Sequence, residues 1–125
     1  MKPIYLLDSA ILIDHRRGIV FAANWLHRLR EGEAVISVIT RAEVMSGGSG
    51  EERTAALELC EQFECLTISK EIADHAAELR RAHRWKLPDA FQAALAIGNA
   101  LRLVTRNSRD FDEKEHAFAL IPYRF

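Results

Sequence analysis

The chain has little of several features that mark whole classes of proteins. It has two cysteines, Cys60 and Cys65, and no second pair that could complete a zinc site or a disulfide framework. No apolar run approaches the ~20 residues of a membrane span, and no secretory signal pattern opens the chain. We therefore expect a soluble cytoplasmic protein with two free thiols and no membrane partner.

An excess of charge of one sign is also lacking. The 125 residues include 17 Lys and Arg against 18 Asp and Glu, a formal net charge of −1. Tight nonspecific binding to nucleic acid depends on many contacts between basic residues and phosphates. Any contact of this chain with a nucleic acid must therefore be local or assisted by a partner.

Motifs of several α/β enzyme families are missing as well. No G-x-G-x-x-G and no G-x-x-x-x-G-K-[ST] occurs, so dinucleotide-binding and P-loop functions have no support. Ala10 breaks the D-x-D pattern of haloacid-dehalogenase-type phosphotransferases. A receiver domain needs an acidic pair after its first strand and a lysine after its last, and Ser9 and positions 124–125 match neither requirement.

Short apolar segments alternate with helical patterns along the chain. Strands are predicted at 4–7, 34–37, 65–68, 103–105 and 118–121. Helices are predicted at 9–15, 19–30, 40–46, 51–63, from a cap at Ser69 through 79, and at 89–100. The glycine-rich stretch 47–50 is too short for a domain linker and is interpreted as a loop. Helices between apolar strands indicate a parallel sheet covered on both faces, so we expect a single α/β domain of three layers over residues 1–125.

Four acidic residues lie where predicted strands end or helices begin. Asp8 follows the first strand, Glu43 lies in the third helix, Asp89 opens an alanine-rich helix, and Asp110 follows the strand at 103–105. Ligands of open α/β sheets bind beyond the carboxyl ends of the strands. Oxygen-only ligands favour Mg²⁺ or Mn²⁺ over zinc. Four carboxylates gathered at this edge predict a metal-dependent nuclease.

Each acid alone also has an ordinary structural explanation. Asp8 can cap a helix, and Thr40 with Glu43 has the spacing of a capping box. Asp89 lies in a first helical turn, where the helix dipole favours negative charge, and Asp110 lies in a polar turn. Together, however, two carboxylates ~4 Å apart repel by about 4 kcal/mol at an effective dielectric near 20. A cluster of this kind must bind a cation, hold a proton with a raised pKa, or be spread more widely.

Basic residues near these acids are candidate substrate contacts. Arg41, Arg106 and Arg109 lie near the acidic edge of the predicted sheet. The run 80–86 is basic and contains one aromatic residue, Trp85. It is interpreted either as a solvated helix end or as a clamp on an RNA backbone with Trp85 stacked on a base.

The segments 6–9, 41–43, 87–96 and 104–111 carry the sequences LLDS, RAE, LPDAFQAALA and VTRNSRDF. In this order and spacing they resemble PIN domains, and more closely the VapC-type toxins of bacterial and archaeal toxin–antitoxin systems. The resemblance covers nearly the whole chain. It implies a three-layer PIN-like fold with a parallel sheet of about five short strands in the order 3-2-1-4-5, flanked by helices.

The same resemblance implies a function and a set of site residues. The chain would be a magnesium-dependent endoribonuclease that hydrolyses RNA phosphodiester bonds, forms a homodimer and is inhibited by a cognate VapB-like antitoxin. The metal-binding and catalytic residues would be Asp8, Glu43, Asp89 and Asp110. The residues that support the site or contact substrate would be Ser9, Thr105, Arg106 and Asn107.

One position departs from a common form of the family. Many relatives carry an aspartate where this chain has Asn107, and Asp110, three residues further on, would supply that charge instead. Two other readings stay open. The first is a PIN-like module with a weakened site that binds RNA or protein. The second is a metal-dependent phosphatase of small molecules.

Overall fold

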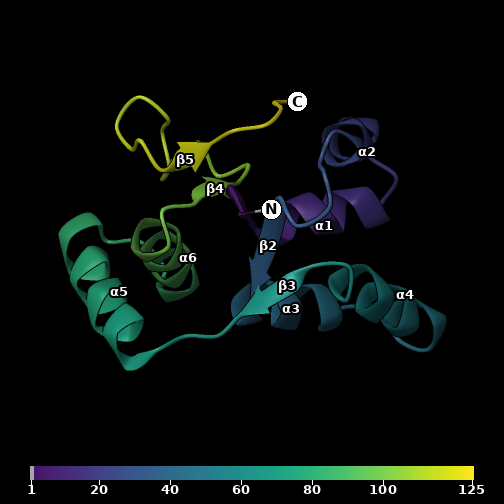
Figure 1. Cartoon of the computed structure of the whole chain (residues 1–125), viewed down its shortest axis with the longest axis horizontal. Coiled ribbons are helices and arrows are strands. Elements are labelled where there is room, and N and C mark those ends of the chain that lie inside the picture. Colours follow the sequence, from purple (N-terminus) through teal and green to yellow (C-terminus); the bar gives the residue numbers. More distant parts are fainter. Residues whose placement is uncertain (1) are drawn as a thin grey trace.

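A parallel β-sheet forms the middle of the molecule, with helices on both of its faces (Figure 1). The structure is a computed structural model and describes residues 2–125. Its strands are β1 (Tyr5–Leu7), β2 (Ala34–Ser37), β3 (Glu64–Leu66), β4 (Arg102–Val104) and β5 (Ala119–Leu120). Its helices are α1 (Ser9–Arg16), α2 (Val20–His27), α3 (Val38–Met45), α4 (Glu51–Cys60), α5 (Lys70–His83) and α6 (Leu87–Gly98). The strands pair in parallel in the order β3-β2-β1-β4-β5, which confirms the predicted fold class and strand order.

The pleat of the sheet divides the apolar core in two. Leu6 pairs in register with Val35 of β2 and with Leu103 of β4, and all three belong to the core under α5 and α6. The next residues along the same strands belong to the core under α1, α2, α3 and α4, and they are Leu7, Ile36 and Val104. Side chains that alternate between faces in this way are the rule in strands. Because both faces are apolar, the inner positions of the strands are apolar, and the polar residues Glu64, Arg102 and Ser37 lie at strand ends.

The described helices and strands match the predicted ones in number and order, with ends that differ by a few residues. The largest difference is at α5, which continues to His83 rather than ending at residue 79, followed by α2, which ends at His27 rather than at residue 30, and α4, which ends at Cys60 rather than at residue 63. Ser69 caps α5 as predicted, because its Oγ accepts a hydrogen bond of 3.1 Å from the Ile72 amide. The sheet edge at which the strands end is therefore where the sequence places it.

The beginning of α3 differs from the prediction for a clear reason. The helix starts at Val38, and its N-cap is Ser37, whose Oγ accepts a hydrogen bond of 3.1 Å from the Thr40 amide. A capping box between Thr40 and Glu43 is therefore wrong, since the Thr40 amide already has a partner. Glu43 is left exposed in the second half of the helix, without a capping role.

Two further expectations concern the thiols and the membrane. Both cysteines are free, and burial raises the pKa of the Cys60 thiol within the core. Across residues 2–125, no helix combines the length and the apolar character that crossing a bilayer requires.

Candidate active site

Three neighbouring strands bring polar residues to one edge of the sheet. β1, β4 and β2 end at Leu7, Val104 and Ser37, and Asp8 and Thr105 directly follow the first two. Because the strands are parallel, these ends meet on one side. Asp8, Ser37 and Thr105 are all buried, which is unusual for polar residues unless each has a hydrogen-bonding partner.

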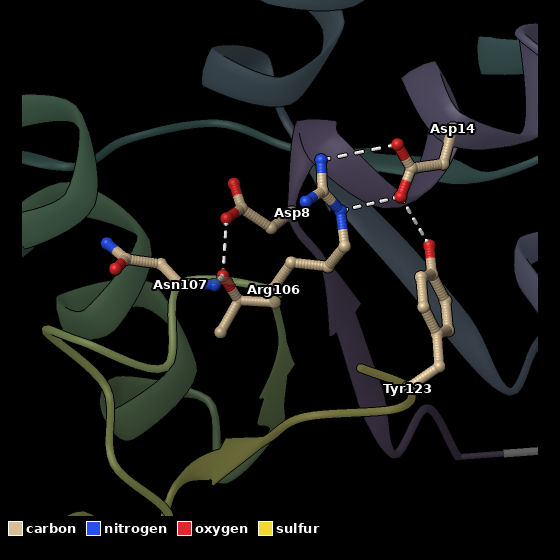
Figure 2. Close-up of polar contacts among 6 residues, drawn as sticks. Asp8, Asp14, Arg106, Asn107 and Tyr123 are labelled. Carbon is tan, nitrogen blue, oxygen red and sulfur yellow. Dashed lines mark hydrogen bonds and ion pairs between the residues drawn. The ribbon is translucent and has the colours of Figure 1, made fainter. Parts of the chain in front are cut away.

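Asp8 is held by donors from three elements. Its Oδ1 accepts hydrogen bonds from the Ser9 amide at 2.9 Å and from Gln92 Nε2 of α6 at 3.3 Å. Its Oδ2 accepts a hydrogen bond of 2.7 Å from Thr105 Oγ1, at the end of β4. Figure 2 shows Asp8 beside the segment that carries Arg106 and Asn107. The carboxylate is thus fixed in orientation, with 9% of the residue exposed.

Gln92 is the centre of this arrangement, and the sequence analysis did not single it out. Its Oε1 accepts a hydrogen bond of 2.7 Å from Ser37 Oγ, and its Nε2 donates to Thr40 Oγ1 at 2.8 Å as well as to Asp8. Thr40 Oγ1 in turn donates to the Leu7 carbonyl at 2.9 Å. An amide in an otherwise apolar helical segment, three residues after Asp89, is the signal that could have identified it. A fully connected network of this kind holds its members rigidly.

Asp89 lies in the first turn of α6 as predicted, and it is half-buried. Burial, and after it the negative charges of Asp8, Asp110 and Glu43, together raise the pKa of its carboxyl to about 6, against a smaller opposing effect of Lys86. This confirms the expectation that crowding raises the pKa of at least one carboxyl, although burial is the larger cause. The four predicted acids therefore share one electrostatic environment.

Asp110 and Asn107 form a closed turn after β4. Asn107 Nδ2 donates to Asp110 Oδ2 at 3.0 Å, and the Asp110 amide donates back to Asn107 Oδ1 at 3.2 Å. The Asn107 amide also donates to Thr105 Oγ1 at 3.1 Å. Asn107, which has no charge, thus positions both Asp110 and Thr105, the threonine that donates to Asp8.

The acids are spread more widely than a tight metal cage. Within residues 2–125, no three carboxylate, imidazole or thiolate groups lie close enough to bind one ion directly. Among the described residues, only one of the four acids forms an ion pair. This pair joins Arg109 Nε to Asp110 Oδ1 at 3.9 Å and is weak. Oxygen donors with uncompensated negative charge fit a hard divalent cation that keeps several of its waters, as Mg²⁺ does.

A second polar cluster lies next to this edge and involves Arg106. Its Nη2 donates to Asp14 Oδ1 at 3.2 Å, and its Nε forms a close ion pair with Asp14 Oδ2 at 2.6 Å (Figure 2). The Tyr123 hydroxyl donates to the same Oδ2 at 2.8 Å, and burial together with this bond raises the pKa of Tyr123. Asp14 is 3% exposed and was missed by the sequence analysis. In Figure 2 the Arg106 guanidinium is bound to Asp14, which lies in α1.

The proposed stacking of Trp85 on RNA is wrong. Trp85 is 5% exposed, and its ring packs on His83 and Phe111, with centroids 4.1 and 4.8 Å away. It is not available to a nucleic acid, because core residues enclose it. The basic residues before it fit the alternative reading, a solvated helix end. Arg41, another candidate substrate contact, pairs with Glu61 at 3.5 Å.

A cavity of about 400 Å³ lies elsewhere, between α2 and α4, and reaches Ala34 at the beginning of β2. That end of the sheet is opposite to the acids. The cavity is therefore separate from the candidate site, which charge and hydrogen bonding indicate at the carboxyl ends of the strands.

Comparisons with known proteins agree with this geometry. The family described as PIN domain matches residues 5–117. Ribonuclease VapC10 of Mycobacterium tuberculosis is 37% identical over 108 residues, which cover 82% of this chain and 81% of that protein.

Solved structures are similar over nearly the full length. A toxin–antitoxin complex from Klebsiella pneumoniae superposes with a TM-score of 0.87 at 33% identity, covering 97% of this chain and 99% of that chain. VapBC-1 from nontypeable Haemophilus influenzae superposes with a TM-score of 0.70 at 23% identity, covering 90% and 92%. The second likeness concerns the fold alone.

Proposed function

The chain belongs to the PIN-domain family, and on that premise we propose that it is a metal-dependent endoribonuclease of the VapC toxin type, which hydrolyses RNA phosphodiester bonds. The observation that carries the proposal is the pair of acids Asp8 and Asp89. One is fixed by donors from three elements, and the pKa of the other is raised to about 6 by burial and by its acidic neighbours. The relative named as a ribonuclease supports the substrate class.

The cofactor of this proposal is Mg²⁺, with Mn²⁺ as an alternative. Asp8 and Asp89 would hold the ion directly or through water, and Glu43 and Asp110 would complete the site. When bound, such an ion polarises a phosphate oxygen and lowers the pKa of a bound water. The spread of the acids supports ligation that is partly through water, because no three of them share one point in the described chain.

The chain's own residues supply orientation and a proton acceptor. Thr105 and Gln92 keep the Asp8 carboxylate in one orientation, so that no reorganisation is needed during the reaction. Asp89, whose carboxyl has a pKa of about 6 in the metal-free chain, is suited to take up a proton near neutral pH when no ion is bound to it directly. Asn107 holds Asp110 toward the same edge, and Ser9, which is partly exposed, is placed to bind water or phosphate.

The partners in this proposal are an RNA substrate, a VapB-like antitoxin and a second copy of the chain. A solved complex similar to this chain is described as toxin–antitoxin. An acidic edge attracts a basic side chain of an inhibitor by complementary charge. We also propose that residues 1–125 act as a single domain, since both cores share one sheet, and that the protein works in the cytoplasm, where its RNA substrate is found.

The rival reading, a PIN-like module that binds without cleaving, depends on Asn107. The structure favours the nuclease over this reading, because Asn107 donates to Asp110 and so brings a charge to the turn that the asparagine itself lacks. The two readings differ in whether the chain cleaves RNA, not in whether it binds RNA.

The experiment that tests the proposal compares cleavage with binding. Purified protein should degrade a structured RNA in Mg²⁺, stop in EDTA, and leave a chromogenic phosphate ester intact. Asp8→Asn and Asp89→Asn should reduce cleavage at least a hundredfold, within the range that such groups contribute. Asp74→Asn, the same change on the exposed surface of α5, serves as the control. Full cleavage by the Asp8 or Asp89 variant would refute the assignment, and phosphate-ester turnover would favour a phosphatase.

A further inference from the structure

Three aromatic rings are grouped on the surface beside the acidic edge. Phe21 of α2 lies 6.0 Å from Tyr123 and 6.2 Å from Phe125 between ring centroids, and Tyr123 lies 5.8 Å from Phe125. The rings are within about 35° of parallel, as the interplanar angles of 28°, 28° and 34° show. Phe125 is 75% exposed and Phe21 is 52% exposed. Exposed apolar side chains that are gathered together, rather than scattered, indicate a binding surface.

A cation is fixed against this stack. The Arg106 guanidinium carbon lies 5.0 Å from the centroid of the Phe125 ring. Asp14 and Tyr123 hold that guanidinium and the neighbouring segment in place (Figure 2). Flat rings next to a guanidinium plane are the surface on which unpaired bases stack, whatever their sequence.

A cavity of about 320 Å³ opens beside Arg106, Tyr123 and Phe125. It is lined by Arg106, Ser108, Ile121, Tyr123, Arg124 and Phe125. Two arginines, a hydroxyl and two rings are suited to a ligand that has both a phosphate and a flat base. The Arg124 cation is available to a phosphate, because its side chain is 62% exposed in its ion pair with Glu113, at 3.4 Å, and ion pairs of exposed cations contribute little.

The cavity is connected to the acids through the segment after β4. Arg106 lies between Thr105, which donates to Asp8, and Asn107, which donates to Asp110. A strand whose scissile phosphate lies over Asp8 would therefore have its neighbouring nucleotides beside Arg106. The near-zero net charge of the chain requires contacts of this local kind.

We propose that Phe21, Tyr123 and Phe125, with Arg106 and Arg124, form a stacking subsite for an unpaired nucleotide of a single-stranded RNA next to the cleaved bond. The subsite rests on the proposed ribonuclease function and adds to it a preference for single strands or loops. A protein partner fits less well, because the cavity itself holds two cations beside the rings.

The test measures RNA binding separately from cleavage. A fluorescein-labelled single-stranded RNA of about twelve nucleotides is titrated with the chain in EDTA, and binding is followed by fluorescence anisotropy. Phe125→Ala and Phe21→Ala should each weaken binding by about tenfold. Val20→Ala is the matched control, since Val20 is 66% exposed on the same helix as Phe21. Duplex RNA of the same sequence should show no difference between these proteins.

Cleavage kinetics give a second measurement. In Mg²⁺ the phenylalanine variants should raise KM with kcat within about twofold, since they remove binding and not chemistry. Arg124→Gln should reduce the slope of log affinity against log salt by about one. Thermal unfolding confirms that each variant is folded.

The outcomes separate this inference from the proposed function. Unchanged RNA affinity and unchanged KM in both phenylalanine variants would overturn the subsite, even if the protein cleaves RNA. RNA binding that depends on the rings, in a chain that never cleaves, would support the subsite and refute the nuclease. Loss of self-association or of antitoxin binding, with RNA affinity intact, would overturn the subsite in favour of a protein interface.

Discussion

At the scale of single residues, the site contains two carboxyl groups whose surroundings differ. Asp8 is more buried than Asp89, yet three donors point at it. Burial and like charges raise the pKa of Asp89 to about 6. A carboxylate in those surroundings destabilises the metal-free fold, and the energy it costs is recovered when a cation binds.

Asp89→Asn is therefore expected to stabilise the metal-free protein at pH 7.5. A carboxyl whose pKa is higher in the folded state contributes stability below its unfolded pKa of about 4, and loses it as pH rises through 6. After a discount for partial exposure, the gain from the substitution should be about 1–2 kcal/mol. Urea unfolding in EDTA measures it, and the gain should shrink toward pH 4. A variant that is less stable than the natural chain at pH 7.5 would contradict the shift.

At the scale of elements, Asp14 joins three parts of the chain that are far apart in sequence. It lies in α1, and it binds Arg106 after β4 and Tyr123 near the C-terminal end. Because Arg106 separates Thr105 from Asn107, this junction fixes the segment that orients the acids. The junction thus supports the acidic edge without contributing an acid to it.

Asp14→Asn is expected to weaken the fold and the site together. It leaves the Arg106 guanidinium, a third of whose side chain is exposed, without its counter-charge, at a cost of about 1–3 kcal/mol. Tyr123→Phe, which removes one hydrogen bond, should cost about 0.5–1.5 kcal/mol. Chemical unfolding and kcat for RNA report both effects. Glu61→Gln removes an exposed ion pair and should change stability by less than about 0.5 kcal/mol. Equal effects of the buried and exposed changes would argue against the junction.

The elements also show how much of the structure could be predicted from the sequence. Strand ends and the acids after them follow from apolar patterning, so the edge and its four acids were predictable. The start of α3 was not, because Ser37 and Thr40 are both competent caps, and only the buried bonds of Thr40 to Leu7 and Gln92 decide between them.

A local backbone conformation and a long-range contact explain the other differences. Trp85 follows a basic run, but Arg84 adopts a left-handed conformation with φ of 60°, and the chain then turns the ring into the core. The partners Asp14 and Arg106 are 92 residues apart. No local pattern in one sequence reveals a pair at that separation.

At the scale of the whole molecule, the proposed metal binding would be coupled to folding. The acidic edge exists only when β1, β4 and α6 are assembled, so an ion that binds there binds the folded state. Ligands that bind only the folded state raise its stability by mass action. The elevated pKa of Asp89 makes this coupling depend on pH.

Mg²⁺ is expected to raise the melting temperature at pH 8 and to have much less effect at pH 5. Below pH 6 a proton competes with the ion for Asp89. At a hundredfold excess over the dissociation constant, the gain should approach about 2.7 kcal/mol. Scanning calorimetry with Mg²⁺ and with EDTA measures the difference, and Asp8→Asn should abolish it. An equal shift at both pH values would mean that the ion binds elsewhere.

The hydrogen bonds to Asp8 also have a consequence for the order of synthesis. Gln92 and Thr105 follow Asp8 by 84 and 97 residues, and chains emerge from the ribosome with the N-terminal end first. A growing chain therefore carries the acid long before it carries the groups that orient it. The oriented edge forms only when nearly all of the 125 residues have been made. A nuclease built in this way stays inert beside the RNA of the ribosome that makes it, until its synthesis is almost finished.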